Sequence, residues 1–222
     1  EENSKILAEK IKNSLLESNF VYEEENPELV IILGGDGKLL RTVHNYMDKI
    51  DKIDFVTFTT GTLGYASDFH QLEVDEFIKL LISHEYSIEK IHLLEATINY
   101  YQKKETLYAL NEIRLENRHH TCVIDLFINE QHFENFRGNG ICVSTPFGST
   151  GYNKSLNGAV VLNDVKVLQI TEIAGIHNTT YRSLGNSLIV NDAATITLKP
   201  GTKYPLIGLD HLIIDSNNLK SI

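Results

Sequence analysis

The feature that most constrains the fold is a five-residue apolar run at 29–33, which ends in a Gly-Gly-Asp-Gly loop at 34–37. Such a run, bounded by polar residues and glycines, is typical of a strand buried on both faces of a parallel sheet. Helically spaced apolar residues precede it from Ile6 to Leu16, with Asn3 and Ser4 as candidate caps. Later patterns predict a helix over 38–47, a strand over 55–59, a glycine loop at 61–64 and a helix over 74–82. This alternation predicts an α/β lobe with a parallel sheet.

From about Ile88 onward, apolar residues recur at every second position, as at Ile124, Leu126 and Ile128. This period is that of strands with one buried face. Asn129-Glu130 is a candidate turn, and later strands are predicted over 187–190, 195–198 and 212–215. A loop that opens a helix is expected at 148–156. The chain is therefore predicted to form two domains, an α/β lobe over 1–90 and a β-rich sandwich lobe over 91–222.

The composition limits the partners that this chain can bind. The 222 residues include 30 acidic and 20 basic side chains, and the formal net charge of −10 argues against a long polyanion such as DNA. The two cysteines are too few for a zinc knuckle or a disulfide scaffold. No apolar run approaches the roughly 18 to 20 residues of a membrane span, and the first residues lack signal-peptide features. We therefore expect a cytoplasmic protein that binds neither nucleic acid nor membranes.

The glycine loop is the first candidate functional feature. Gly34, Gly35 and Gly37 would let the main chain approach a bulky anion, and the following helix would direct free amides to the same place. The carboxylate of Asp36 would repel a phosphate unless a metal lies between them or the carboxylate accepts a proton. Asp36 is therefore a candidate base or metal-linked residue. A simple strand-to-helix turn explains the same four residues about equally well.

A second cluster, at 144–155, combines hydroxyl side chains and glycines with Tyr152 near the start of the expected helix. A helix cap uses one hydroxyl, whereas this segment has five hydroxyl residues besides Tyr152. A nucleotide base and its ribose need several donors and acceptors beside a flat ring, so the segment is a candidate nucleotide pocket. A third, weaker feature is Asn111-Glu112, whose amide and carboxylate can bind ribose hydroxyls. Such pairs are also common on protein surfaces.

Taken in this order, the three features resemble the bacterial NAD kinase family. Residues 34–37 resemble its GGDG loop, Asn111-Glu112 its NE pair, and 144–155 its hydroxyl-rich segment. Residues 136–138, 171–174 and 210–211 agree as well, so the resemblance covers nearly the whole chain. It implies a Rossmann-like lobe with a parallel sheet plus a β-sandwich lobe, the plan shared by NAD kinases and diacylglycerol kinases, and assembly as a homotetramer.

By this resemblance, the chain would phosphorylate the 2′-hydroxyl of the adenosine ribose of NAD and so make NADP. Asp36 would accept the proton of that hydroxyl, and a divalent metal ion such as Mg²⁺ would spread the charge, with no residue assigned as a metal ligand. ATP and inorganic polyphosphate both remain open as phosphoryl donors, because both present the same terminal phosphate to a glycine loop.

The resemblance also assigns a substrate site. The glycines of 34–37 would form the phosphate loop, Asn111 and Glu112 would hold the ribose or adenine of NAD, and His211 would lie near the phosphates. Ala174 would complete the pocket, from the same chain or from a neighbouring subunit. The other residues assigned to substrate are Gly37, Leu40, Tyr65, Arg137, Asn139, Phe147, Thr150, Gly151, Tyr152, Asn153, Lys154 and Ser155.

Three residues depart from the family pattern. Asn139 stands where an aspartate is common, which replaces a charged contact to the dinucleotide with a neutral one. Gly151 replaces a usual alanine, which keeps the backbone donor and loosens the turn. Lys38 replaces a threonine, and it either adds charge near a phosphate or is solvated on the helix surface. Segments that the family has before the first helix and beyond Ile222 lie outside this sequence.

Two other functions stay open. A lipid kinase of the diacylglycerol or sphingosine type shares the GGDG loop, but its later glycine motif differs from 148–152, and this chain has no basic amphipathic stretch for a membrane surface. A non-catalytic, dinucleotide-binding regulator is compatible with Asn139 and Lys38. Parallel assays with NAD and diacylglycerol would separate these functions.

Overall fold

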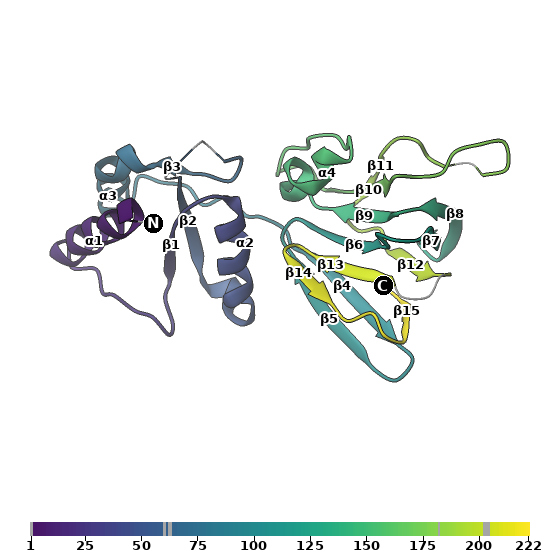
Figure 1. The fold of residues 1–222 in the computed structure, drawn as a ribbon. Coiled ribbons are helices and arrows are strands. Elements are labelled where there is room, and N and C mark those ends of the chain that lie inside the picture. Colours follow the sequence, from purple (N-terminus) through teal and green to yellow (C-terminus); the bar gives the residue numbers. More distant parts are fainter. Residues whose placement is uncertain (1, 60, 62–63, 182, 202–204) are drawn as a thin grey trace. The chain divides into compact units, whose positions relative to one another are not determined.

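The computed structural model describes residues 2–59, 61, 64–181, 183–201 and 205–222 (Figure 1). The chain divides into two compact units, Glu1–Lys90 and Ile91–Ile222, and each is described by itself. Within these ranges, we find no helix with the length and hydropathy that crossing a bilayer requires.

The N-terminal unit is a small parallel sheet covered by helices. Its elements are α1 (Glu2–Glu17), β1 (Leu29–Leu33), α2 (Asp36–Asn45), the 3₁₀ helix η1 (Met47–Lys52), β2 (Asp54–Thr59), β3 (Phe69–His70), the 3₁₀ helix η2 (Gln71–Glu73) and α3 (Val74–Ser83). β2 pairs in parallel with β1 on one side and with β3 on the other. Figure 1 shows α1 and α3 on one side of this sheet and α2 on the other. Strand β1 is therefore covered on both faces, as its apolar run predicts.

Aromatic packing forms the centre of the N-terminal core. Phe58 of β2 is fully buried, stacks on Phe69 with 5.3 Å between ring centroids, and meets Phe77 of α3 edge-on at 5.1 Å. Ile11 of α1 packs into the same cluster, whereas Leu39 of α2 is buried elsewhere in the unit. Because Leu33 and Phe58 belong to this core, it holds the ends of β1 and β2 together, and the glycine loop begins at the end of β1.

The C-terminal unit is an antiparallel β structure with one short helical segment. Its elements are β4 (Leu94–Tyr100), β5 (Lys104–Ala109), β6 (Glu112–Glu116), β7 (Cys122–Ile128), β8 (Gln131–Gly138), β9 (Gly140–Ser144), η3 (Phe147–Thr150), α4 (Tyr152–Ser155), β10 (Val167–Ile173), β11 (Leu188–Asn191), β12 (Ile196–Pro200), β13 (Leu206–Leu209), β14 (Leu212–Ile214) and β15 (Leu219–Ser221). A six-stranded sheet has the order β11-β10-β9-β6-β13-β14, and two three-stranded sheets have the orders β12-β7-β8 and β15-β4-β5. Leu198 and Ile222 exchange two backbone hydrogen bonds, of 2.9 and 3.0 Å, which join the two smaller sheets.

The inner faces of these sheets share one hydrophobic core. Ile113 and Leu115 of β6 and Ile170 of β10 pack with Ile124 of β7 and Phe136 of β8, and all five are nearly or fully buried. Alternate residues along the strands enter this core, which is the physical origin of the period-two pattern. On β6, the residues between the core positions are charged, and they lie on the opposite face of the six-stranded sheet.

Local expectations were met to different degrees. Asn129 and Glu130 have φ angles of 50° and 66° and join β7 to β8, which confirms the predicted two-residue hairpin turn. The cap prediction for Asn3 and Ser4 is wrong, because α1 already includes both residues. The loop that opens a helix, expected at 148–156, is formed by η3 followed by the four-residue α4, and Gly151 separates the two with a non-helical ψ of −134°. In the predicted loop 61–64, residues 62 and 63 lie outside the described residues.

Candidate functional site

In the N-terminal unit, the glycine loop joins β1 tightly to α2. The Gly34 amide donates to the Phe58 carbonyl at 2.8 Å, and Gly34 has a φ of 155°, which strains any other residue. Gly35 is the N-cap of α2, so Asp36 and Gly37 are its first two residues. The loop therefore places the start of a ten-residue helix at the carboxyl end of a buried parallel strand, an arrangement that binds phosphates in other proteins.

The Asp36 carboxylate is exposed beside this loop. Its Oδ1 atom accepts a 3.4 Å hydrogen bond from the Ala66 amide. A Cβ atom at Gly64 would overlap the same carboxylate, so glycine at 64 leaves the space that Asp36 occupies. Leu40 is half-buried on α2, and Tyr65 is 66% exposed next to Gly64. Among the residues that the structure describes, no three acidic, histidine or cysteine side chains are grouped to hold a metal ion.

In the C-terminal unit, Asn111-Glu112 lies directly against the hydroxyl-rich segment. The Thr145 amide donates to the Asn111 carbonyl at 2.9 Å, and the Thr145 hydroxyl donates to the Leu110 carbonyl at 2.7 Å. A Cβ atom at Gly148 would overlap the Asn111 backbone, and one at Gly151 would lie 3.1 Å from Asn111 Nδ2. Two features 30 residues or more apart in sequence thus form one site, and the glycines allow the close approach.

Asp210 fixes the backbone of the Asn111-Glu112 pair. Its carboxylate accepts hydrogen bonds from the amides of Leu110, Asn111 and Glu112, at 2.8, 2.8 and 3.1 Å. Its own amide donates to the Glu112 carbonyl at 3.0 Å, and its φ of 49° turns the chain between β13 and β14. His211 follows it and is exposed. Sequence reasoning noted residues 210–211 but assigned no role to Asp210, because the contact is made across about 100 residues of chain.

Glu112 is the buried charge of the site. Only 3% of the residue is exposed, and its Oε1 atom accepts a 2.9 Å hydrogen bond from Arg114 Nη1. Its Oε2 atom is buried without a hydrogen-bond partner in the described part of the chain. Burial raises the pKa of Glu112 to about 7, against the opposing charge of Arg114 and with smaller contributions from Asp210 and Glu116. Because its Oε2 atom has no partner among the described residues, this carboxyl group can accept a hydrogen bond from a ligand hydroxyl.

Arg114 lies between Glu112 and Tyr152, and sequence reasoning did not identify it. Its guanidinium carbon is 4.8 Å from the centroid of the Tyr152 ring. Both side chains line a pocket of about 310 Å³, together with Asn139 and Ile173. Burial raises the pKa of the Tyr152 hydroxyl. The sequence signal for Arg114 was its place in the alternating run Glu-Ile-Arg-Leu-Glu of β6.

Asn139 lines this pocket, and Ala174 directly follows Ile173, which lines it too. Asn139 links β8 to β9, donates its amide to the Ile173 carbonyl at 2.8 Å, and donates its side-chain amide to the Asn117 carbonyl at 3.4 Å. Ala174 is exposed just after β10, with a φ of 47°, and its carbonyl lies where a Cβ atom at Gly138 would be. Both residues thus sit where β8, β9 and β10 meet.

The other predicted residues lie in three different settings. Thr150 is half-buried at the end of η3, while Lys154 and Ser155 are exposed on α4. Asn153 is fully buried, and its amide bonds to Ser149, Ala159 and Thr171, which holds the segment 149–159 on the outer face of the sheet.

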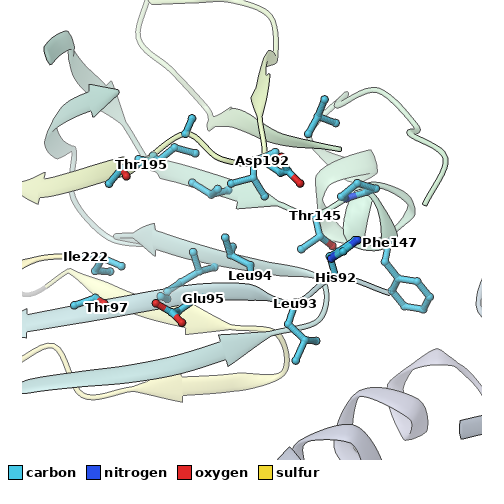
Figure 2. A pocket seen from close by; sticks show the side chains of 18 of the residues that line it. His92, Leu93, Leu94, Glu95, Thr97, Thr145, Phe147, Asp192, Thr195 and Ile222 are labelled. Carbon is cyan, nitrogen blue, oxygen red and sulfur yellow. The ribbon is translucent and has the colours of Figure 1, made fainter. Parts of the chain in front are cut away.

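The last two predicted site residues, one cationic and one aromatic, are not in the lining of the pocket of about 310 Å³, which we call the small pocket. Arg137 lies with its guanidinium carbon 4.6 Å from the Tyr181 ring centroid. Phe147 lines a separate cavity of about 530 Å³ in the C-terminal unit, with Thr145 and His92 at the same end (Figure 2). The site of the C-terminal unit therefore centres on Asn111, Glu112 and the segment 144–152.

Comparisons with known proteins agree with this geometry. A model of the ATP-NAD kinase C-terminal domain matches residues 110–214. NAD kinase 1 of Listeria innocua serovar 6a is 39% identical over 209 residues, which cover 93% of this chain and 79% of that protein. The NAD kinase of Geobacillus stearothermophilus is 39% identical over 222 residues, which cover 99% of this chain and 82% of that protein.

Solved structures give the same fold. Yeast NADH kinase complexed with NADH superposes with a TM-score of 0.77 at 25% identity, covering 88% of this chain and 57% of that one. An NAD kinase from Archaeoglobus fulgidus in complex with ATP superposes with a TM-score of 0.72 at 18% identity, covering 96% of this chain and 84% of that one. The predicted fold class, an α/β unit followed by an antiparallel β-rich unit, is confirmed. The chain belongs to the NAD kinase family.

Proposed function

We propose that this chain transfers the terminal phosphoryl group of ATP to the 2′-hydroxyl of the adenosine ribose of NAD, which yields NADP. The observation that carries the proposal is the union of Asn111-Glu112 with the segment 144–152 around a buried carboxyl oxygen that lacks a partner in the described residues. A buried acceptor of this kind is stabilised when a ligand donates to it. ATP as the donor is supported by the Archaeoglobus fulgidus relative, which was solved with ATP.

The C-terminal unit would bind the dinucleotide. Glu112 would accept from a ribose hydroxyl, the Asn111 amide would bind the ribose or adenine, and the Tyr152 ring offers a flat apolar face. Thr150 and Gly151 would line the same pocket, because Gly151 lies against both Asn111 and Glu112. The other family-assigned contacts are Arg137, Asn139, Phe147, Asn153, Lys154, Ser155, Ala174 and His211.

The N-terminal unit would supply the phosphate loop and the base. Gly34, Gly35 and Gly37 shape the turn at the start of α2, with Leu40 and Tyr65 beside it. Asp36 would accept the proton of the attacking hydroxyl, which is supported by its exposed carboxylate next to that turn. The positioning of the two substrates would supply most of the rate enhancement.

The residues present fit a magnesium ion that enters with the phosphoryl donor. No cluster of three ligands occurs among the described residues, and Mg²⁺ is typically held by one or two carboxylates together with substrate phosphates. The donor phosphates would hold such an ion, which leaves the Asp36 carboxylate available to accept the proton, and the ion would neutralise charge on the transferred phosphoryl group.

We further propose a homotetramer in the cytoplasm. Side chains such as Leu162, 73% exposed, and Ile213, 69% exposed, support subunit contacts in the C-terminal unit. Ala174 is exposed and directly follows Ile173, which lines the small pocket, and a neighbouring subunit would complete the pocket beside it. Both cysteines are buried thiols, which suits a reducing compartment.

The test is a phosphorylation assay on the purified chain. NAD and Mg²⁺ are incubated with ATP or with inorganic polyphosphate, and NADP is measured with an NADP-specific dehydrogenase. NADP formed with ATP supports the proposal, and diacylglycerol in place of NAD should give no product. Tight NAD binding by calorimetry with no NADP from either donor would contradict it and favour a non-catalytic regulator.

A further inference from the structure

We propose that Arg114 is a positioning residue, which holds the Glu112 carboxylate and the Tyr152 ring in the arrangement that binds NAD. The proposal rests on the proposed function, in which Glu112 and Tyr152 contact the dinucleotide. Arg114 itself need not touch either substrate.

The side chain of Arg114 connects three parts of the site. It projects from β6 on the face opposite the hydrophobic core and is only 14% exposed. Its Nη1 atom donates to Glu112 Oε1 at 2.9 Å, and its Nη2 atom donates to the Asp210 carbonyl at 3.5 Å. Its guanidinium carbon lies 4.8 Å from the Tyr152 ring centroid. One planar group thus contacts the buried acid, the turn that fixes the Asn111-Glu112 backbone, and the aromatic ring.

The sheet leaves room for this guanidinium at Gly208. Residue 208 of β13 pairs directly with Arg114, and a Cβ atom there would lie 2.5 Å from Nη2 and 2.7 Å from Nε. Even alanine would therefore displace the guanidinium from its present position. The space above Gly208 is what keeps Arg114 flat against the sheet and within reach of Glu112.

Arg114 and Glu112 each keep one buried polar atom without a hydrogen-bond partner in the described residues, and the stability of the fold does not explain this. Its Nε atom is buried with no hydrogen-bond partner in the described part of the chain, and an unpaired buried donor destabilises a fold. The Glu112 Oε2 atom is left unpaired in the same manner. An ion pair that served only to stabilise the fold would pair these atoms. Here the two open atoms belong to the two side chains of one site.

Arg114 also sets the charge of Glu112. The titratable and charged groups that act on Glu112 or on its neighbours here are Arg114, Glu116, Arg118, Cys142, Tyr152 and Asp210. Arg118 acts on Tyr152, whereas Arg114 acts on Glu112 itself and lowers its pKa against the effects of burial, Asp210 and Glu116. Without it, the pKa of Glu112 would rise above about 7, and less of the carboxyl would be ionised at neutral pH.

The first experiment compares Arg114→Gln with Lys220→Gln in the full chain. Lys220 is exposed on β15 of the same unit and lies outside the lining of the 310 Å³ pocket, so its replacement removes one positive charge away from the site. We expect Arg114→Gln to raise the KM for NAD about tenfold, because a hydrogen bond to a charged group is worth that much, and to change kcat little. The pH above which the KM reaches its low plateau should also move upward. Lys220→Gln should keep the wild-type KM and pH profile.

A double-mutant cycle separates positioning from a general structural role. If Arg114 acts through Glu112, Arg114→Gln should add little to the KM increase already caused by Glu112→Gln. Arg114→Lys, which keeps the charge and loses the forked geometry, should give an intermediate KM and a near wild-type pH profile, and it replaces Arg114→Gln if that variant does not fold.

The outcomes distinguish this proposal from the proposed function. A wild-type chain that makes no NADP contradicts the proposed function. An active wild-type chain in which the Arg114 variants match Lys220→Gln in KM and pH profile overturns the positioning role alone. Independent KM effects in the cycle overturn it too.

Discussion

The buried carboxyl of Glu112 leads to a quantitative prediction, because replacing it with glutamine should stabilise the fold at alkaline pH while weakening NAD binding. Its pKa of about 7 in the folded chain lies above the ordinary value of 4.5, so the folded state binds this proton more tightly than the unfolded state does. The stability of the wild-type chain therefore falls as the pH rises from 4.5, and the loss is complete above pH 7. Glutamine resembles the neutral carboxyl and lacks this loss.

The magnitude follows from the two pKa values. At about 1.4 kcal/mol for each pH unit, the difference between 4.5 and about 7 corresponds to about 3 kcal/mol in favour of Glu112→Gln above pH 7. At pH 4.5 to 5 the two proteins should differ by less than about 1 kcal/mol, because the carboxyl is then mostly neutral in the folded state. All other titrating groups are common to both proteins and cancel in the difference.

The assay is urea unfolding at pH 5 and at pH 8.5. The chain contains no tryptophan, so the β-sheet signal in circular dichroism is the suitable probe. A stability difference that is the same at both pH values would show that the change does not arise from the ionisation of Glu112. A wild-type chain more stable than the variant at pH 8.5 would refute the reasoning directly. In an activity assay without urea, the KM of Glu112→Gln for NAD should exceed that of the wild type, because an amide nitrogen replaces one buried acceptor oxygen of the carboxyl group.

Three further perturbations test other parts of the molecule. Asp36→Asn should lower kcat by roughly 10²- to 10⁴-fold while NAD binding stays measurable by calorimetry, and an unchanged kcat would remove Asp36 from the chemistry. Gly208→Ala should displace the Arg114 guanidinium and reproduce the KM increase of Arg114→Gln without changing the charge; a KM equal to wild type would show that the guanidinium position is unimportant. Burial, followed by the nearby Glu172 carboxylate, raises the pKa of Glu134 to about 7, so Glu134→Gln should raise the Tm more at pH 8 than at pH 5. Equal gains at both pH values would contradict that last expectation.

Much of the N-terminal unit could be predicted from sequence because its signals are local. The apolar run of β1 is an uninterrupted five-residue segment, and the glycines after it mark the turn into α2. The hairpin at Asn129-Glu130 was predictable for the same reason, since two adjacent polar residues separate two alternating runs. Such features depend on a few neighbouring residues, so tertiary context did not alter them.

The organisation of the C-terminal site could not be predicted in this way. The roles of Arg114 and Asp210 arise only when β6 is placed between β9 and β13, which the local pattern does not specify. The alternation along β6 indicated that charged residues share one face, but not that Gly208 would lie beside one of them. The sequence indicated a loop that opens a helix at 148–156, but it did not show that Gly151 divides this segment into η3 and the four-residue α4.

The anchoring of the Asn111-Glu112 backbone by Asp210 has a consequence for the order of events during biosynthesis. A nascent chain that ends at Ser155 already contains Asn111, Glu112 and the whole hydroxyl-rich segment. It still lacks β13 and the Asp210 carboxylate, which accepts hydrogen bonds from the amides of Leu110, Asn111 and Glu112 in the folded chain. Closing a loop of about 100 residues must precede those bonds, and such long-range closures are slow steps in β-rich domains. We therefore expect the proposed dinucleotide contacts to be among the last parts of the unit to become ordered, after residue 210 has left the ribosome.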